Sequence, residues 1–134
     1  MSIDNAVIQE FLDKKNVIAV VGVSRNPKKY GNRVFHDLLE AGYKVYAVHV
    51  AAGMVGEHKC YASVTDLPEK PDVVNLVVPH QVTEKVVREC KELGVTKIWM
   101  QPGSESEDAI EYCNENNMAV LHDVCIMVEK TKLH

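Results

Sequence analysis

The sequence has no apolar run that approaches the ~20 residues needed by a membrane-spanning helix, so we expect no membrane insertion. It also has no signal-peptide pattern at its start, because Asp4, Glu10 and Asp13 interrupt that segment. Its four cysteines lie far apart and form no C-x-x-C pair, which argues against a disulfide framework. We therefore expect a cytoplasmic protein with reduced thiols.

The sequence also lacks an excess of positive charge. Its formal net charge is −4, whereas a general nucleic-acid binder needs a basic face to neutralise phosphates, so we expect no nucleic-acid partner. A local basic cluster is present nevertheless, at Arg25, Lys28, Lys29 and Arg33. A cluster of this size suits one small anionic ligand.

No linker, low-complexity tract or internal repeat divides the 134 residues, which predicts a single domain over 1–134. Apolar runs alternate with amphipathic segments along the chain. The expected strands cover 17–23, 43–50, 72–78, 97–100 and 118–122, while 51–61 is expected to be irregular, with a short strand near 59–61. The expected helices cover 3–15, 81–93, 105–116 and 126–130, with a further helix between the turn after 23 and Gly42.

This alternation predicts an α/β fold. Strands that are apolar on both faces indicate a doubly wound parallel sheet of about five strands with helices on both faces. The apolar face of helix 3–15 packs either on this sheet or on a second copy of the chain, and the second arrangement predicts a homodimer. Ser104-x-x-Glu107 matches a capping box for helix 105–116. Ligands bind such sheets at the carboxyl ends of the strands, which here gathers 22–33, 49–53, 78–82 and 101–104.

One stretch carries the main functional signal. The apolar strand 17–23 leads into a turn that contains Gly22, Ser24 and Gly31 together with the basic cluster, and an amphipathic helix follows. A helix that begins just after such a turn directs unpaired backbone N–H groups and a partial positive charge at the turn. The stretch therefore predicts a phosphate-binding site.

The same stretch lacks the features of common nucleotide sites. It departs from G-x-G-x-x-G, because Gly22 is followed by Ser24 and the next glycine is Gly31. A dinucleotide site also needs an acidic residue at the end of the second strand to hold the ribose hydroxyls, and His49-Val50 stands there instead. The sequence contains no P-loop G-x-x-x-x-G-K-[ST]. These absences disfavour NAD and nucleoside triphosphates.

Several segments carry a family resemblance that spans about residues 14–130. They are VVGVSRNPKKYGNRVFHDLLEAGYKVYAV, Gly56, Cys60-Tyr61, PDVVNLVVP, KIWMQPG and HDVCIMVEK. Together they resemble the small CoA-binding proteins, which are similar to the N-terminal CoA-binding domain of the succinyl-CoA synthetase alpha subunit. The family usually has Asn-Pro directly after the second strand, where this chain has His49-Val50.

The resemblance implies a Rossmann-like sheet that binds CoA or an acyl-CoA across its strand ends. It implies no ligase activity, because the synthetase takes its phosphorylated histidine from a second domain. The implied contacts of the phosphates are Gly22, Val23, Ser24 and Arg25, and Tyr30 and Gly31 would close that turn of the binding site. The implied contacts of the adenine are His49, Val50, Val78, Pro79 and Val82. Lys28 is a further candidate contact, because CoA carries a pyrophosphate and a 3′-phosphate that a cationic side chain would attract.

Two alternatives stay open. One is a NAD(P)-dependent oxidoreductase, and the other is a thiol role in which Cys125 or Cys60 forms a mixed disulfide with CoA. We assign no catalytic residue, because the histidines at the strand ends have no evident nucleophile or carboxylate partner. We expect no metal, because His122-Asp123-Val124-Cys125 gives poor ligand geometry.

Overall fold

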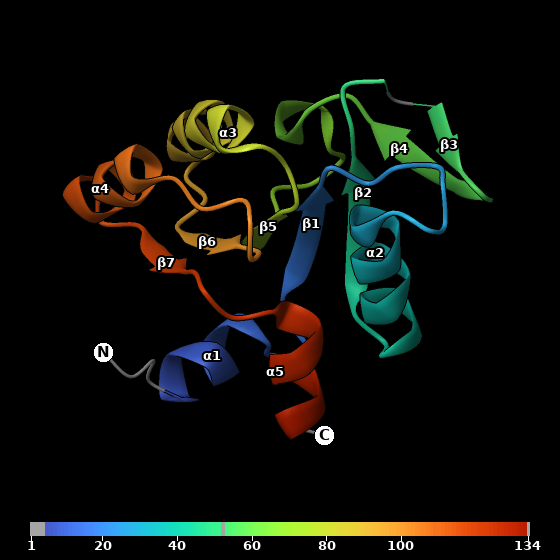
Figure 1. The fold of residues 1–134 in the computed structure, drawn as a ribbon, viewed down its shortest axis with the longest axis horizontal. Coiled ribbons are helices and arrows are strands. Elements are labelled where there is room, and N and C mark those ends of the chain that lie inside the picture. The colour runs from blue at the N-terminus through green and yellow to red at the C-terminus, as the bar shows by residue number, and fades with distance from the viewer. Residues whose placement is uncertain (1–4, 52, 134) are drawn as a thin grey trace.

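Valine and isoleucine dominate the central strands, because branched side chains suit a pleated surface that is buried on both faces. The computed structural model describes residues 5–51 and 53–133. Within them the strands are β1 (Val17–Val21), β2 (Lys44–Val48), β3 (Gly53–Val55), β4 (His58–Tyr61), β5 (Val73–Leu76), β6 (Lys97–Met100) and β7 (Ala119–Leu121). They form one Rossmann-like sheet in the order β3-β4-β2-β1-β5-β6-β7 (Figure 1).

The sheet has seven strands among the described residues, so the expectation of about five was too low. The two additional strands form a hairpin within 51–61, where β4 corresponds to the short strand expected near 59–61 and β3 was not expected. Val55 pairs with His58, which leaves Gly56 and Glu57 as the turn, and Gly56 adopts a φ of 60°. β3 runs antiparallel to β4, whereas every other pairing in the sheet is parallel. Three-residue strands are too short to give a periodic signal.

Helices cover both faces of the sheet, as a doubly wound fold requires (Figure 1). One face carries α1 (Asn5–Phe11), α2 (Tyr30–Glu40) and α5 (Ile126–Leu133). The other carries α3 (His80–Leu93), α4 (Glu107–Glu115) and a short 3-10 helix (Val64–Asp66). None of the described helices is both long and apolar enough to cross a membrane.

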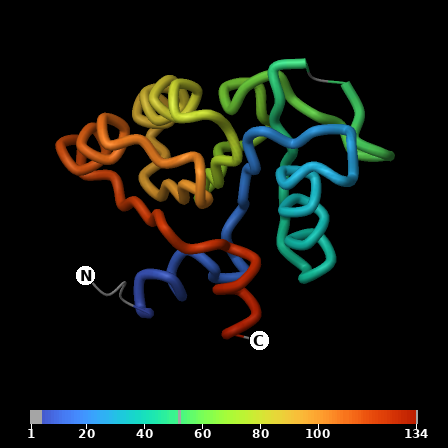
Figure 2. The backbone as a smooth tube through the Cα atoms, viewed as in Figure 1, coloured from blue at the N-terminus to red at the C-terminus, as the bar shows by residue number. Residues whose placement is uncertain are grey.

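The N-terminal helix packs on the chain's own sheet. Phe11 lies edge-to-face with Trp99 of β6, with 6.0 Å between the ring centroids. The helix ends before residue 15, because the Asn16 side-chain amide donates to the carbonyls of Glu10 and Phe11. Residues 3 and 4 of the expected helix lie outside the described residues. The apolar face of α1 is therefore covered within the chain, and Figure 2 traces α1 and α5 on the same side of the sheet.

The start of α4 differs from the expected capping box. Ser106 is the N-cap, and its Oγ accepts a hydrogen bond from the Ala109 N–H at 3.2 Å. Ser104 is buried two residues earlier, where its Oγ accepts from the Val78 N–H. The capping-box assignment was wrong. Local spacing offers both Ser104 and Ser106 as the N-cap, and the contacts of Ser104 with the segment after β5 leave Ser106 to cap the helix.

This cap gives a prediction about stability. Ser106→Ala is expected to lower the free energy of unfolding by about 1 kcal/mol, because it removes the acceptor for an N-terminal helix N–H. Glu107→Ala is expected to change it by less than about 0.5 kcal/mol, because Glu107 is exposed and makes no box. Urea denaturation of both variants measures the difference, and an equal loss in the two would favour the capping box.

Candidate ligand-binding site

The strand order reverses between β1 and β5. β1 continues through α2 to β2 on one side, whereas β5 continues through α3 to β6 on the other. The carboxyl ends of these parallel strands share one edge of the sheet, where crevices form at such a switch. The topology brings the turn 22–29, the segment after β2 and the segment after β5 to this edge, as the sequence predicted.

Two glycines let three backbone segments touch at this edge. A Cβ on Gly22, whose φ is 104°, would lie 2.0 Å from the Val77 carbonyl oxygen, and a Cβ on Gly31 would lie 2.1 Å from the Gly22 carbonyl oxygen. The N–H groups of Gly22 and Val23 donate to the Val48 carbonyl. Gly22, Val23 and Gly31 therefore have structural roles that hold the turn against β2 and β5.

Short side chains organise the turn itself. Ser24 Oγ accepts from the Asn26 N–H at 3.0 Å, and Asn26 Oδ1 accepts from the Lys28 N–H at 2.9 Å. The buried Asn32 side chain donates to the Ser24 carbonyl at 2.8 Å. Lys29 is the N-cap of α2, and no side chain caps that helix. The N-terminus of α2 therefore faces a pre-shaped turn, as anion sites at helix N-termini do. The sequence analysis did not single out Asn26 or Asn32.

A pocket of about 350 Å³ opens beside the turn and is walled by the β3–β4 hairpin. Its lining residues are Val23, Ser24, Arg25, His49, Ala51, Val55 and Cys60. The Arg25 guanidinium lies against Gly53 of β3, where a Cβ would come within 2.5 Å of its Nη2 atom. Burial raises the pKa of the Cys60 thiol, although the Arg25 charge lowers it. Strand β3, which was not predicted from the sequence, therefore holds the Arg25 guanidinium beside the pocket.

A second pocket lies on the other side of His49, toward α3. The residues that line it include His49, Val50, Ser63, Val82, Lys85 and Glu89. The His49 Nδ1 atom accepts the Ala51 N–H at 3.0 Å, so the neutral ring carries its proton on Nε2. Three predicted adenine contacts, His49, Val50 and Val82, therefore share one pocket. Lys85 was missed, although it follows Val82 by one helical turn.

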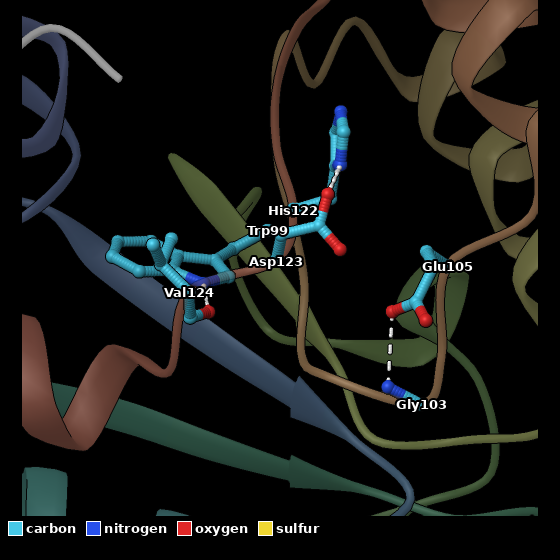
Figure 3. A network of polar contacts seen from close by, with 6 residues as sticks. All are labelled: Trp99, Gly103, Glu105, His122, Asp123 and Val124. Atoms are coloured by element: carbon cyan, nitrogen blue, oxygen red, sulfur yellow. Dashed lines mark hydrogen bonds and ion pairs between the residues drawn. The ribbon is translucent and has the colours of Figure 1, made fainter. Parts of the chain in front are cut away.

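The segment after β5 is tied to the turn that follows β6. The Val78 N–H donates to Ser104 Oγ at 2.9 Å, and Thr83 Oγ1 donates to the Ser104 carbonyl at 2.7 Å. Pro79 is exposed and forms the N-cap of α3. The Gly103 N–H donates to the Glu105 carboxylate within this turn (Figure 3). Val78 and Pro79 thus lie at the carboxyl edge as expected, in a segment that hydrogen bonds join to the turn after β6.

Tyr30 differs in placement from the other predicted contacts. It is the first residue of α2, but its hydroxyl lies 3.0 Å from Cys125 Sγ and 2.7 Å from Gln101 Nε2, under the helix. Asn75 of β5 donates to Gln101 Oε1 at 3.2 Å. We call Tyr30, Asn75, Gln101 and Cys125 the Gln101 cluster. Sequence reasoning treated Gln101 as part of a turn, because no spacing signal marks a buried polar side chain at a strand end.

Other parts of the surface suit a phosphate ligand less well. A groove of about 400 Å³ lies beside α4, and its lining includes His122 and three carboxylates, Glu107, Glu111 and Glu115. These carboxylates repel an anion. His122 Nδ1 and an Asp123 carboxylate oxygen lie 2.6 Å apart (Figure 3). Over residues 5–51 and 53–133, no group of three or more His, Cys, Asp or Glu side chains could hold a metal ion. Compared with the groove beside α4, the edge with α2 is better suited to an anion.

The chain is similar to several known proteins. The CoA binding domain family model matches residues 16–131. The alpha subunit of ADP-forming acetate–CoA ligase II from Pyrococcus furiosus is 31% identical over 125 residues, which cover 85% of this chain and 27% of the subunit. The chain thus spans about a quarter of that relative.

Two further relatives match over nearly their whole length. The uncharacterized protein YneT from Bacillus subtilis is 28% identical, with 92% of this chain and 91% of that protein covered. A solved structure of a hypothetical protein from Pyrococcus horikoshii superposes with a TM-score of 0.93 at 32% identity, with 98% of this chain and 93% of that chain covered.

Proposed function

Because the chain belongs to the CoA binding domain family, we propose that it binds coenzyme A or an acyl-CoA across the carboxyl ends of β1, β2 and β5. One observation carries the proposal. The uncapped N-terminus of α2 faces a turn that holds a hydroxyl and cationic side chains, at the point where the strand order reverses. A helix N-terminus in this position favours a phosphate through its N–H groups and its dipole.

The pyrophosphate of CoA belongs at this turn. Ser24, Arg25 and Lys28 supply a hydroxyl and two cations there, and the hydrogen bonds of Ser24 and Asn26 fix the loop before the ligand arrives. A preorganised loop reduces the entropy lost on binding. Charge-assisted hydrogen bonds to phosphate are stronger than neutral ones, so this turn supplies much of the affinity.

The adenosine belongs across the mouth of the pocket between His49 and α3, because the pocket's volume of about 50 Å³ is too small to enclose it. Val50 and Val82 give that pocket apolar walls, and the His49 ring stands between it and the turn pocket. Lys85 brings a cation to the same pocket, where it suits the 3′-phosphate of CoA. Glu89 follows Lys85 by four residues, one helical turn along the same face, and an ion pair with Lys85 would orient the amine.

Calorimetry distinguishes this proposal from a nicotinamide-dependent enzyme. The purified chain is titrated with CoA, acetyl-CoA and NADH under identical conditions. We expect heat of binding with both CoA compounds and a much weaker response with NADH, because no carboxylate follows β2 to hold the adenosine ribose. Absence of CoA binding at millimolar ligand would contradict the proposal.

Matched charge variants locate the site. Lys28→Ala is expected to weaken CoA binding roughly fivefold to tenfold and to reduce its salt dependence, because an exposed cation contributes about 1 kcal/mol near a phosphate. Lys91→Ala is the control, because Lys91 is an equally exposed lysine in the last turn of α3, away from the carboxyl edge. Equal effects in the two variants would argue against the turn as the phosphate site.

A further inference from the structure

We propose that Cys125 is a reactive thiolate that exchanges with a disulfide of CoA, so that the CoA bound at the strand ends becomes linked to the protein through a mixed disulfide. The inference rests on the proposed function, because CoA binding brings the disulfide to this edge. It adds a covalent step to a binding site, and it assigns the Gln101 cluster the role of preparing the sulfur.

Hydrogen-bond donors and acceptors fix the orientation of Gln101. Its Oε1 accepts from the Ile126 N–H at 2.8 Å and from Asn75 Nδ2 at 3.2 Å. Its Nε2 therefore points the other way, toward the Tyr30 hydroxyl at 2.7 Å and Cys125 Sγ at 3.4 Å. Because the Tyr30 oxygen accepts from Gln101, the Tyr30 proton is directed at the sulfur, 3.0 Å away.

The sulfur is consequently surrounded by donors. Beyond Tyr30 and Gln101, the backbone N–H groups of Met127 and Val128 at the start of α5 lie near Sγ and lower the pKa of the thiol, while the Val128 N–H donates its hydrogen bond to the Cys125 carbonyl. A protonated thiol uses few of these donors, whereas a thiolate accepts all of them. Burial raises the pKa of Cys125, but the hydrogen bonds outweigh it and the net shift is downward. Burial and the Cys125 contact raise the pKa of Tyr30 to about 12, so Tyr30 stays a donor.

Asn75 provides a separate observation beside Gln101, a buried amide oxygen that no described residue satisfies. Its side chain is fully buried and its Nδ2 is directed at Gln101 Oε1. Its Oδ1 has no hydrogen-bond partner among the described residues, which is costly for a buried amide oxygen. A secondary amide N–H satisfies such an oxygen, and the pantetheine arm of CoA carries two of them.

Cys125 is also the accessible thiol at the right edge. Cys90 and Cys113 are buried, and Cys60, although it lines the pocket beside the turn, is buried with a raised thiol pKa, whereas Cys125 is partly exposed. The Trp99 indole N–H donates to the Val124 carbonyl at 2.9 Å and so fixes the residue before it (Figure 3). One tyrosine side chain separates the sulfur from the first turn of α2, and the pantetheine arm is longer than that.

The chemistry balances without a further oxidant. The Cys125 thiolate attacks the CoA sulfur of a CoA disulfide, a new S–S bond forms, and the old S–S bond breaks. The electron pair leaves on the second thiolate, which takes a proton from water. One disulfide is consumed and one is formed. Attack on a thioester fits less well, because it creates an oxyanion, while the donors of Tyr30 and Gln101 are directed at the sulfur itself.

Mass spectrometry of the intact chain tests the proposal. The reduced protein, freed of reductant, is incubated with CoA disulfide. We expect one CoA adduct per chain, located at Cys125 by peptide mapping and removed by dithiothreitol. Cys125→Ser is expected to give no adduct, whereas Cys113→Ala, which removes a buried thiol on the opposite face, keeps it. An adduct at another cysteine, or none, overturns the proposal.

Two further arms separate the chemistry from the binding. Tyr30→Phe is expected to slow adduct formation about threefold. Loss of the donated hydrogen bond raises the pKa of Cys125 and lowers its thiolate fraction roughly tenfold, but a thiolate of higher pKa is more nucleophilic and offsets part of that loss. CoA disulfide is expected to react more than tenfold faster than glutathione disulfide, and equal rates would overturn the CoA-directed step. CoA heat of binding without an adduct rejects this inference alone, whereas absence of that heat rejects the proposed function.

Discussion

Gly22→Ala is expected to lower the melting temperature of the protein by about 10 °C or more. The new Cβ would lie 2.0 Å from the Val77 carbonyl oxygen and 2.9 Å from a Val78 methyl carbon, and the Val77 backbone cannot move aside as a flexible side chain does. The φ of 104° is itself strained for alanine. Overpacking and backbone strain each cost about 1–3 kcal/mol, and 1 kcal/mol corresponds to roughly 3–6 °C in a domain of this size.

Gly103→Ala separates the two causes. Gly103 has a φ of 93°, but its added Cβ would meet no atom within 4 Å, so only the backbone strain remains. Differential scanning calorimetry of both variants is expected to show a loss for Gly22→Ala at least twice that for Gly103→Ala. Similar losses would mean that close contact between the segments after β1 and β5 is unimportant, and Gly22 would then be a turn residue alone.

Gln101→Met is expected to lower the free energy of unfolding by about 2–4 kcal/mol. Gln101 is completely buried, and methionine keeps its length while removing both polar atoms. The Ile126 N–H and Asn75 Nδ2 then lose their acceptor, and a buried unsatisfied donor costs about 1–3 kcal/mol. The start of α5 loses its link to β6 in the same step.

Gln9→Met is the matched control, because Gln9 is exposed on α1 and the substitution is the same. It is expected to change stability by less than about 0.5 kcal/mol. Guanidinium denaturation gives both values. A Gln101→Met variant as stable as the control would show that water or a shifted side chain replaces the lost acceptor, and the proton arrangement inferred for Cys125 would then fail.

The sequence predicted the central layers of the fold well. Runs such as 17–21 and 73–76 are apolar on both faces, so strand type and parallel pairing follow from composition, and helix stripes such as Val34 and Leu38 show which face packs inward. The short strand expected near 59–61 is present as β4, but β3 and its pairing with β4 were not predicted, because Gly53–Val55 is too short to show a pattern. Tertiary contacts also moved the cap of α4 from Ser104 to Ser106.

The edge of the sheet that carries the candidate site could also be predicted, because topology fixes where the carboxyl ends of the strands lie in a doubly wound sheet. The roles of single residues were less so. Gly22 and Gly31 were predicted as part of a phosphate-binding turn. The structure shows that close backbone packing is by itself a sufficient reason for glycine at both positions. Tyr30 looked like part of the turn, and its hydroxyl instead reaches a cluster assembled from residues far apart in the chain. Pairings at such sequence separations leave no local pattern.

The indole of Trp99 also makes the protein its own optical reporter. It is the chain's one tryptophan, it is fully shielded from water, and its N–H holds the Val124 carbonyl directly ahead of Cys125. Indole emission shifts toward the red when solvent reaches the ring. Fluorescence excited selectively in this ring would therefore follow release of the C-terminal segment from the sheet in real time, without any attached dye.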